Sequence, residues 1–225
     1  MINNPTLKDI AQKLGLSIST VSRALQNHPD INKNTIAQIR KLAKEIGYFP
    51  DALAISLKKK KTHTIGVIVP EISHFFFSSV IDGIEEITYK DGYTILVTKS
   101  NENLEREILN MESLISNRVA GVIASISQST EDGSHFNRVI ARGTPLVLFD
   151  RVLEDLEVSK VISNDYENVY ETVNHLIESG FRHIAHLSGP PHLNITKYRL
   201  EGYKKALIDN GLEVMDEMKI GRAHV

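Results

Sequence analysis

Residues 6–27, TLKDIAQKLGLSISTVSRALQN, carry two short helical patterns separated by a single glycine. Apolar residues of the first pattern recur at spacings of three and four, and Thr6 followed by Asp9 forms the pattern of a capping box. Gly15 suits the end of this helix, because helices commonly end at a residue with positive φ and glycine adopts that conformation at little cost. Ser17 is a suitable N-cap for the second helix. The stretch therefore predicts a helix-turn-helix.

The second helix of this unit has an outer face suited to a major groove. A helix-turn-helix places the first residues of its second helix against base edges. Ile18 could touch a thymine methyl group, Ser19 could hydrogen-bond to either kind of base, and Arg23 could bind guanine or a phosphate. The alternative is that these are two amphipathic helices of an ordinary bundle. On the first interpretation, the expected DNA-binding residues of the unit are Thr6, Ser17, Ile18, Ser19, Thr20, Ser22 and Arg23.

A third helix is expected directly after the first two. Asn32 can cap it, Gly47 can end it, and the apolar residues between them recur at helical spacing. The free amides at its start suit a phosphate contact, with Lys33 and Thr35 beside them. Residues 1–49 should therefore form a small all-α head with its own apolar core.

A short helical pattern, DALAISLK, follows within residues 50–62 and runs into the basic segment Lys58 to Lys61. At about two turns this helix should be marginal by itself, because helix nucleation is costly and no tertiary packing supports it. We expect it to fold only on DNA. The basic segment is either a DNA contact or a solvated tether.

The head and the segment GYFPDALAISL resemble the head and hinge of the lac-repressor family of bacterial transcription regulators. The resemblance continues through IGVIVPEISHFFFSSVIDGIE, PLVLFDR and HIAHLSGPPHLNITKYRLEGYKKAL, so it covers nearly the whole chain. It implies a homodimer that binds operator double-stranded DNA and a small effector, most often a sugar or sugar derivative. It also implies that paired hinge helices enter the minor groove, where Leu57 would wedge between base pairs and Ala54 would form the packing contact.

From Thr64 onward, apolar strands alternate with amphipathic helices, which predicts a parallel, doubly wound sheet. The expected strands are TIGVIV, YTILVT, VAGVIAS and PLVLF, and the expected helices are 76–90, 104–116 and 136–142. VISND then leads into a second unit with a helix at 168–178, strand HIAHLS and a helix at 195–210. The fold class is thus α/β with an all-α N-terminal domain, and the α/β domain has two lobes. The resemblance implies that these lobes are of the periplasmic-binding-protein type. We expect the domain over 63–225, with lobes at about 63–160 and 161–219.

The loops that follow the strands supply candidate ligand contacts, because ligands of open α/β sheets bind beyond the carboxyl ends of the strands. Asp150 and Arg151 offer an acceptor and donors suited to hydroxyl groups, and two phenylalanines offer flat faces on which a sugar ring could stack. The resemblance adds Arg199. The candidate effector contacts are His74, Phe76, Phe77, Ser125, Asp150, Arg151 and Arg199. The alternatives are that the phenylalanines belong to the core, that Asp150 and Arg151 form a structural ion pair, and that His74 is only a turn residue.

Charge is distributed unevenly over the chain, whose net charge is −2. Residues 1–61 hold 11 Lys and Arg against 4 Asp and Glu, a net +7, so the remainder carries −9. A basic head on an acidic body fits a DNA-binding protein, since phosphate neutralisation supplies most sequence-independent affinity.

Composition excludes several other functions. The chain has no cysteine, and its 9 histidines form no metal-binding spacing, so neither a metal nor another cofactor is expected. The N-terminus lacks a signal-peptide pattern and no apolar run approaches about 18 residues, so a cytoplasmic protein without a membrane partner is expected. The preferred function is transcription regulation by a repressor. A solute-binding protein for sugar uptake is the alternative, and an α/β enzyme is disfavoured by the lack of a catalytic constellation.

The last six residues, 220–225, read IGRAHV and resemble the translation of a common sequencing adapter. We therefore expect this segment to be an artefact and the natural protein to continue through a completed second lobe. Resequencing the source locus across this point tests the expectation.

Overall fold

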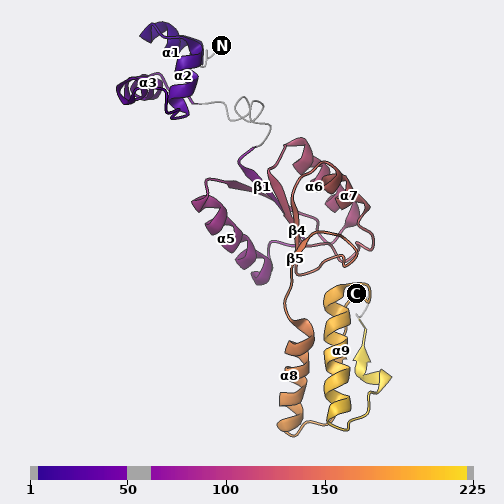
Figure 1. Cartoon of the computed structure of the whole chain (residues 1–225). Coiled ribbons are helices and arrows are strands. Elements are labelled where there is room, and N and C mark those ends of the chain that lie inside the picture. Colours follow the sequence, from indigo (N-terminus) through magenta and orange to yellow (C-terminus); the bar gives the residue numbers. More distant parts are fainter. Residues whose placement is uncertain (1–4, 50–61, 222–225) are drawn as a thin grey trace. The chain divides into compact units, whose positions relative to one another are not determined.

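The computed structural model describes residues 5–49 and 62–221, which belong to two compact units, Met1–Lys60 and Lys61–Val225 (Figure 1). Ala54, Leu57 and the basic segment Lys58 to Lys61, which were expected to form the hinge, lie outside the described residues. Residues 222–225 of the segment expected to be foreign also lie outside them.

The head consists of three helices, α1 (Leu7–Leu14), α2 (Ile18–Leu25) and α3 (Lys33–Glu45). The capping box of Thr6 and Asp9 is present, and Ser17 caps α2, which confirms both predictions. Gly15 has a φ of 65° and ends α1. All three helices contribute to one apolar core, whose buried residues are Ile10, Ala11, Val21, Ala24, Ile39 and Ala43.

The second unit contains a five-stranded parallel sheet in the order β2-β1-β3-β4-β5. Its strands are β1 (Thr64–Val69), β2 (Thr94–Lys99), β3 (Gly121–Ala124), β4 (Leu146–Phe149) and β5 (Ser159–Val161). The strand order reverses at β1, because β2 lies on one side of it and β3 on the other. Such a switch point opens a crevice at the carboxyl ends of the strands.

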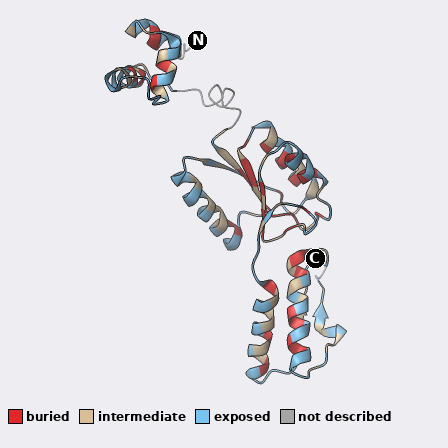
Figure 2. Cartoon of the chain, in the orientation of Figure 1, coloured by how far each residue is buried: buried red, intermediate tan, exposed pale blue. Residues whose placement is uncertain are grey.

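Helices cover both faces of this sheet, as expected for a doubly wound fold (Figure 1). Helix α5 (Phe75–Lys90) packs on one face, against Val67 and Val69. Helices α6 (Leu104–Ser116) and α7 (Ser134–Ala141) pack on the other face, against Ile68 and the buried residues of β3 and β4. Figure 2 shows the resulting concentration of buried residues along the central strands. Side chains of β1 therefore alternate between two apolar cores, because successive residues of a strand point to opposite faces.

The position of β5 corrects the expected organisation of the sheet. Four strands were expected in the first lobe, with VISND leading into the second. Instead, Ser159 pairs with Val147 and Val161 pairs with Phe149, so β5 is the fifth strand of the first sheet. Its three residues lack a strong apolar pattern, and only their pairing with β4 makes them a strand.

The second lobe contains α8 (Asp165–Glu178), α9 (Asn194–Asp209), a 3-10 turn (Asp216–Met218) and the parallel pair β6 (His186–Leu187) and β7 (Lys219–Ile220). The six-residue strand expected at HIAHLS is thus wrong in length. Its partner β7 has only two residues, so only two residues of HIAHLS are paired.

Helices α8 and α9 lie side by side and share an apolar core that includes Val173 and Tyr203. Gly202 permits this close approach, because a Cβ atom there would overlap the backbone carbonyl of Tyr166. Among the residues that the structure describes, no helix has the length and apolar character needed to cross a membrane.

Candidate functional sites

The outer face of α2 presents the side chains expected to read bases. Ile18 is 50% exposed although it is apolar, and Ser19 and Arg23 are also exposed. Within residues 5–49 and 62–221, no carboxylate pairs with Arg23, so its guanidinium is available to an external acceptor. Ser22 is half-buried beside them. An exposed isoleucine next to polar donors at a helix start is an arrangement suited to contacts with base edges.

The other hydroxyls expected at this surface take part in the helix caps. Thr6 Oγ1 accepts from the Asp9 amide at 3.4 Å and donates to the Asp9 carboxylate at 2.8 Å. Ser17 Oγ accepts from the Thr20 amide at 3.1 Å and lies 2.8 Å from the Thr20 hydroxyl. These contacts fix the start of each helix, and any DNA contact by these residues would be made in addition to the cap.

The start of α3 is also exposed and carries no acidic residue in its first turn. Asn32 accepts from the Asn34 amide at 2.8 Å, Lys33 is exposed and Thr35 is half-buried. A helix N-terminus with a lysine and without an acidic residue in its first turn favours an anion such as phosphate.

A cavity of about 410 Å³, here called the polar cavity, lies at the carboxyl ends of the sheet strands. Three of the expected effector contacts line it: His74 at the start of α5, Arg151 after β4, and Arg199 in α9. The structure thus brings together residues that are far apart in the sequence. Leu193 and Ile195 form an apolar part of the cavity wall. Ser188 and Thr196 line the cavity with hydroxyl groups.

Both arginines of the polar cavity are held by carboxylates. Arg151 Nη1 donates to Glu102 Oε1 at 2.8 Å and to Oε2 at 2.9 Å. Arg199 Nε donates to Asp165 Oδ1 at 2.6 Å. The expected alternative, an ion pair between Asp150 and Arg151, is replaced by a pair between Arg151 and Glu102.

Asp150 and Phe76 line a different cavity, of about 450 Å³, here called the apolar cavity. Its wall is formed mainly by apolar residues of α5, β4 and β5. Burial raises the pKa of the Asp150 carboxyl, although Arg151 and Arg199 act in the opposite direction. Asp150 also has a φ of 57°, a conformation that costs a non-glycine residue free energy. Adjacent residues at the end of β4 therefore serve two separate cavities.

The two remaining candidates lie in the interior. Phe77 is only 6% exposed and packs edge-to-face against Phe149, with ring centroids 6.3 Å apart, as the core alternative expected. Ser125 is fully buried, and its hydroxyl has no hydrogen-bond partner among the described residues. Neither residue lines the polar cavity.

Sequence reasoning missed two residues that organise the polar cavity. Glu102 follows β2, so the strand-end rule that identified Asp150 would also have identified it. Asn194 begins α9 and joins this helix to the chain after β4. Its Nδ2 donates to the Asp150 carbonyl at 3.1 Å, and its Oδ1 accepts from the Val152 amide at 3.0 Å. No local pattern indicates that role.

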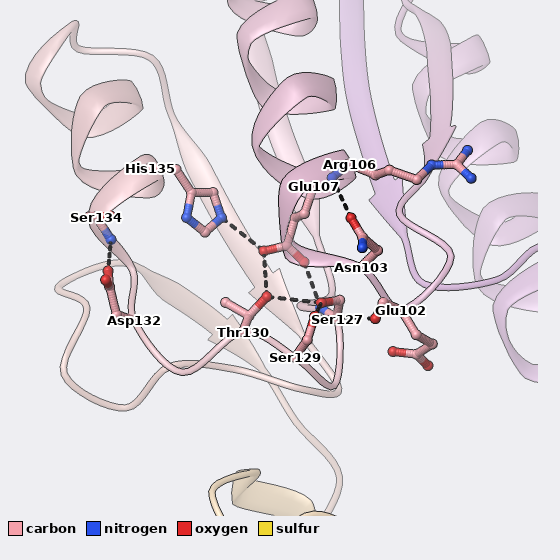
Figure 3. Close-up of polar contacts among 10 residues, drawn as sticks. All are labelled: Glu102, Asn103, Arg106, Glu107, Ser127, Ser129, Thr130, Asp132, Ser134 and His135. Atoms are coloured by element: carbon pink, nitrogen blue, oxygen red, sulfur yellow. Dashed lines mark hydrogen bonds and ion pairs between the residues drawn. The ribbon is translucent and has the colours of Figure 1, made fainter. Parts of the chain in front are cut away.

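Two carboxylates, of Glu102 and Glu107, hold the loop between β3 and α7 against the start of α6, and Figure 3 shows the contacts of Glu107. Glu107 accepts from the Ser127 amide at 2.6 Å, and Glu102 accepts from the Gln128 amide at 2.7 Å. Gln128 lines the polar cavity, so the loop is fixed where it meets the ligand space. Within the described ranges, no group of three or more His, Cys, Asp or Glu is placed to hold a metal.

The chain thus combines a helix-turn-helix head with a two-lobed α/β unit that contains a polar cavity, an architecture of the periplasmic-binding-protein-like type. A family model described as periplasmic binding proteins and sugar binding domain of the LacI family matches residues 62–222. A second, for bacterial regulatory proteins of the lacI family, matches residues 6–51. The chain belongs to the LacI family.

Individual relatives agree with this assignment. The chain is 34% identical over 219 residues to the probable HTH-type transcriptional repressor ExuR of Bacillus subtilis (strain 168), covering 96% of this chain and 64% of that protein. A periplasmic binding protein/LacI transcriptional regulator from Alkaliphilus metalliredigens QYMF, complexed with D-xylulofuranose, is 30% identical with a TM-score of 0.62, over 73% of this chain and 58% of that one. The lac repressor dimer bound to operator and the anti-inducer ONPF shares the fold, with a TM-score of 0.80 at 24% identity, over 97% of this chain and 65% of that one. The chain therefore spans somewhat less than two thirds of the length of these proteins.

Proposed function

We propose that the protein containing this chain is a sequence-specific transcription repressor that acts as a homodimer in the cytoplasm. Its operator affinity would be controlled by a small, hydroxyl-rich effector, a sugar or sugar derivative, bound between the two lobes. The observation that carries the proposal is the presence, on one chain, of an exposed recognition helix and a polar cavity lined by His74, Arg151 and Arg199.

The head supports DNA binding in two ways. Ile18, Ser19 and Arg23 are exposed on one helix face, and the start of α3 offers a second contact through Lys33. The net charge of +7 over residues 1–61 supplies the electrostatic attraction that phosphate contacts require. The repressor function of the relative from B. subtilis points the same way.

The cavity supports a sugar-like effector. Paired guanidinium and carboxylate groups next to hydroxyls and apolar walls can satisfy several ring hydroxyls at once. The relative from Alkaliphilus metalliredigens QYMF is complexed with a sugar, D-xylulofuranose. We propose that Asp150, Phe76 and Ser125 contribute from positions next to the cavity rather than from its lining.

Effector control would act through the relative angle of the two lobes. A ligand that binds one lobe arrangement more tightly shifts the population toward it. In a dimer, that shift would separate or join the two hinge helices, with Leu57 as the wedge in the minor groove and Ala54 at the contact between them.

A solute-binding protein for sugar uptake would account for the α/β unit but would leave the head without a role. An enzyme is a weaker proposal, because the relatives are named as transcription regulators. We therefore retain regulation as the single proposed function.

Selection of bound sites from random duplex DNA tests this proposal. Residues 1–61, fused to a dimerising module, suit the experiment because the head has its own core. At physiological salt we expect enrichment of a pseudo-palindrome with a flexible central step, as dimeric major-groove reading with a hinge wedge requires. Salt-sensitive binding without any enriched sequence would contradict it.

A further inference from the structure

The charged groups of the polar cavity are balanced within the protein. Three charged side chains line it: Glu102, Arg151 and Arg199. Glu102 pairs with Arg151 inside the cavity, and Asp165 pairs with Arg199 from beneath its wall, where it is only 8% exposed. Each guanidinium thus already has a carboxylate partner. Among the described residues, neither guanidinium of the cavity is left without a carboxylate partner for an anionic ligand to replace.

His186, one of the two histidines that line the cavity with His74, adds no positive charge near neutral pH. Burial lowers the pKa of His186, and the nearby charges of Lys219 and Arg199 lower it further. Its ring can therefore act as a neutral donor or acceptor toward a hydroxyl.

We propose that the polar cavity selects a neutral, hydroxyl-rich ligand over an anionic one, and that Glu102 is the residue that sets this selection. The inference rests on the proposed function, since it names the ligand class of the same cavity. A neutral polyol uses the remaining donors of Arg151 and the free lone pairs of Glu102 without breaking their ion pair. A carboxylate or phosphate would have to compete with Glu102 for Arg151 and would also be repelled by it.

Glu102 is placed to exert this effect directly. It is 22% exposed and lines the cavity, whereas Asp165 is buried behind Arg199. Its carboxylate also accepts from the Gln128 amide at 2.7 Å, which fixes its orientation. Its backbone has a φ of 56°, so the fold holds the side chain in this position despite an unfavourable conformation.

The test removes the negative charge of the Glu102 side chain and keeps the shape of that side chain. Glu102→Gln retains an oxygen that can accept from Arg151 or from the Gln128 amide, but it removes the negative charge. Binding of a panel of D-hexoses and D-pentoses and of their matched uronic acids, such as galactose and galacturonate, is measured by calorimetry. The unsubstituted protein should bind the neutral member of a pair more tightly. Glu102→Gln should lower the neutral-to-acid ratio of affinities about tenfold, which corresponds to about 1.4 kcal/mol.

The ratio of the two affinities distinguishes a change in selectivity from a loss of stability, because a loosened cavity would weaken the binding of both members of a pair. Glu105→Gln is the matched control, since it removes the same charge from an exposed position three residues away and should leave the ratio unchanged. Tighter binding of the acid by the unsubstituted protein, or an unchanged ratio in Glu102→Gln, overturns the inference and leaves the proposed sugar effector intact. Failure of the unsubstituted protein to bind any member of the panel overturns the proposed sugar effector together with the inference.

Discussion

Glu107 Oε1 lies 2.8 Å from His135 Nε2, and both side chains are buried, at 0% and 4% exposure (Figure 3). The same carboxylate accepts from the Thr130 hydroxyl at 3.0 Å and from the Ser127 amide at 2.6 Å. Glu107 therefore joins α6, α7 and the loop between β3 and α7. Buried polar groups are costly unless they are paired, so each partner depends on the others.

Replacing Glu107 by Ala should lower the free energy of unfolding by about 3–5 kcal/mol, because the buried His135 and the Ser127 amide lose their partner. Denaturant unfolding followed by circular dichroism measures the change. Glu112→Ala is the control: Glu112 pairs with Arg138 at the surface at 3.1 Å, and its removal should cost at most about 1 kcal/mol. Equal effects of the two substitutions would show that the buried network does not stabilise this lobe.

Gly202→Ala should destabilise the second lobe by about 1–3 kcal/mol, because the added methyl group meets backbone atoms of Tyr166 that cannot move without separating α8 from α9. Gly83→Ala provides the opposite control. Gly83 lies in α5 with open space around its Cα, so alanine there should stabilise by about 0.5–1 kcal/mol through its helix propensity. Thermal unfolding of both variants measures whether each substitution lowers or raises the stability of the protein. Stabilisation by Gly202→Ala would contradict the packing argument.

Asp150→Asn should raise the melting temperature at pH 7. Burial raises the pKa of the Asp150 carboxyl, so its ionised form destabilises the folded protein once the pH exceeds the ordinary value of 3.8. Asparagine removes the charge and tolerates the φ of 57°. The difference in melting temperature between the variant and the unsubstituted protein should shrink as the pH is lowered from 7 toward 4. The Asp150 carboxyl of the unsubstituted protein then becomes protonated in the folded state. Asp155→Asn, at an exposed position, should show no comparable gain.

Arg23→Ala should weaken binding to the selected operator by about 1–3 kcal/mol, because one base or phosphate contact of the recognition helix is lost. Lys44→Ala, which removes one positive charge at the opposite end of the head's third helix, should have a smaller effect that is similar for operator and unrelated DNA. Fluorescence anisotropy titrations with both DNAs provide the comparison. Equal losses for the two variants on the operator would count against the assigned role of Arg23.

The head was determined by its sequence to a large degree. Helix caps at Thr6 and Ser17, the turn at Gly15 and the 3.6-residue apolar period all act between neighbours in the chain, so they can be read without a structure. The alternation of strands and helices in the second unit is equally local. This pattern predicted the bounds of α6 without error and those of α5 within one residue.

The contents of the polar cavity were decided by the tertiary structure. Arg151 and Glu102 are 49 positions apart and meet only because β2 and β4 present their carboxyl ends at the same edge of the sheet. Asp150 and Arg151 are adjacent in the chain, yet they line different cavities. Local patterns specify which residues follow a strand, but the order of strands in the sheet specifies which of those residues meet. The family and the head could therefore be read from the sequence, whereas the charge balance of the cavity required the fold.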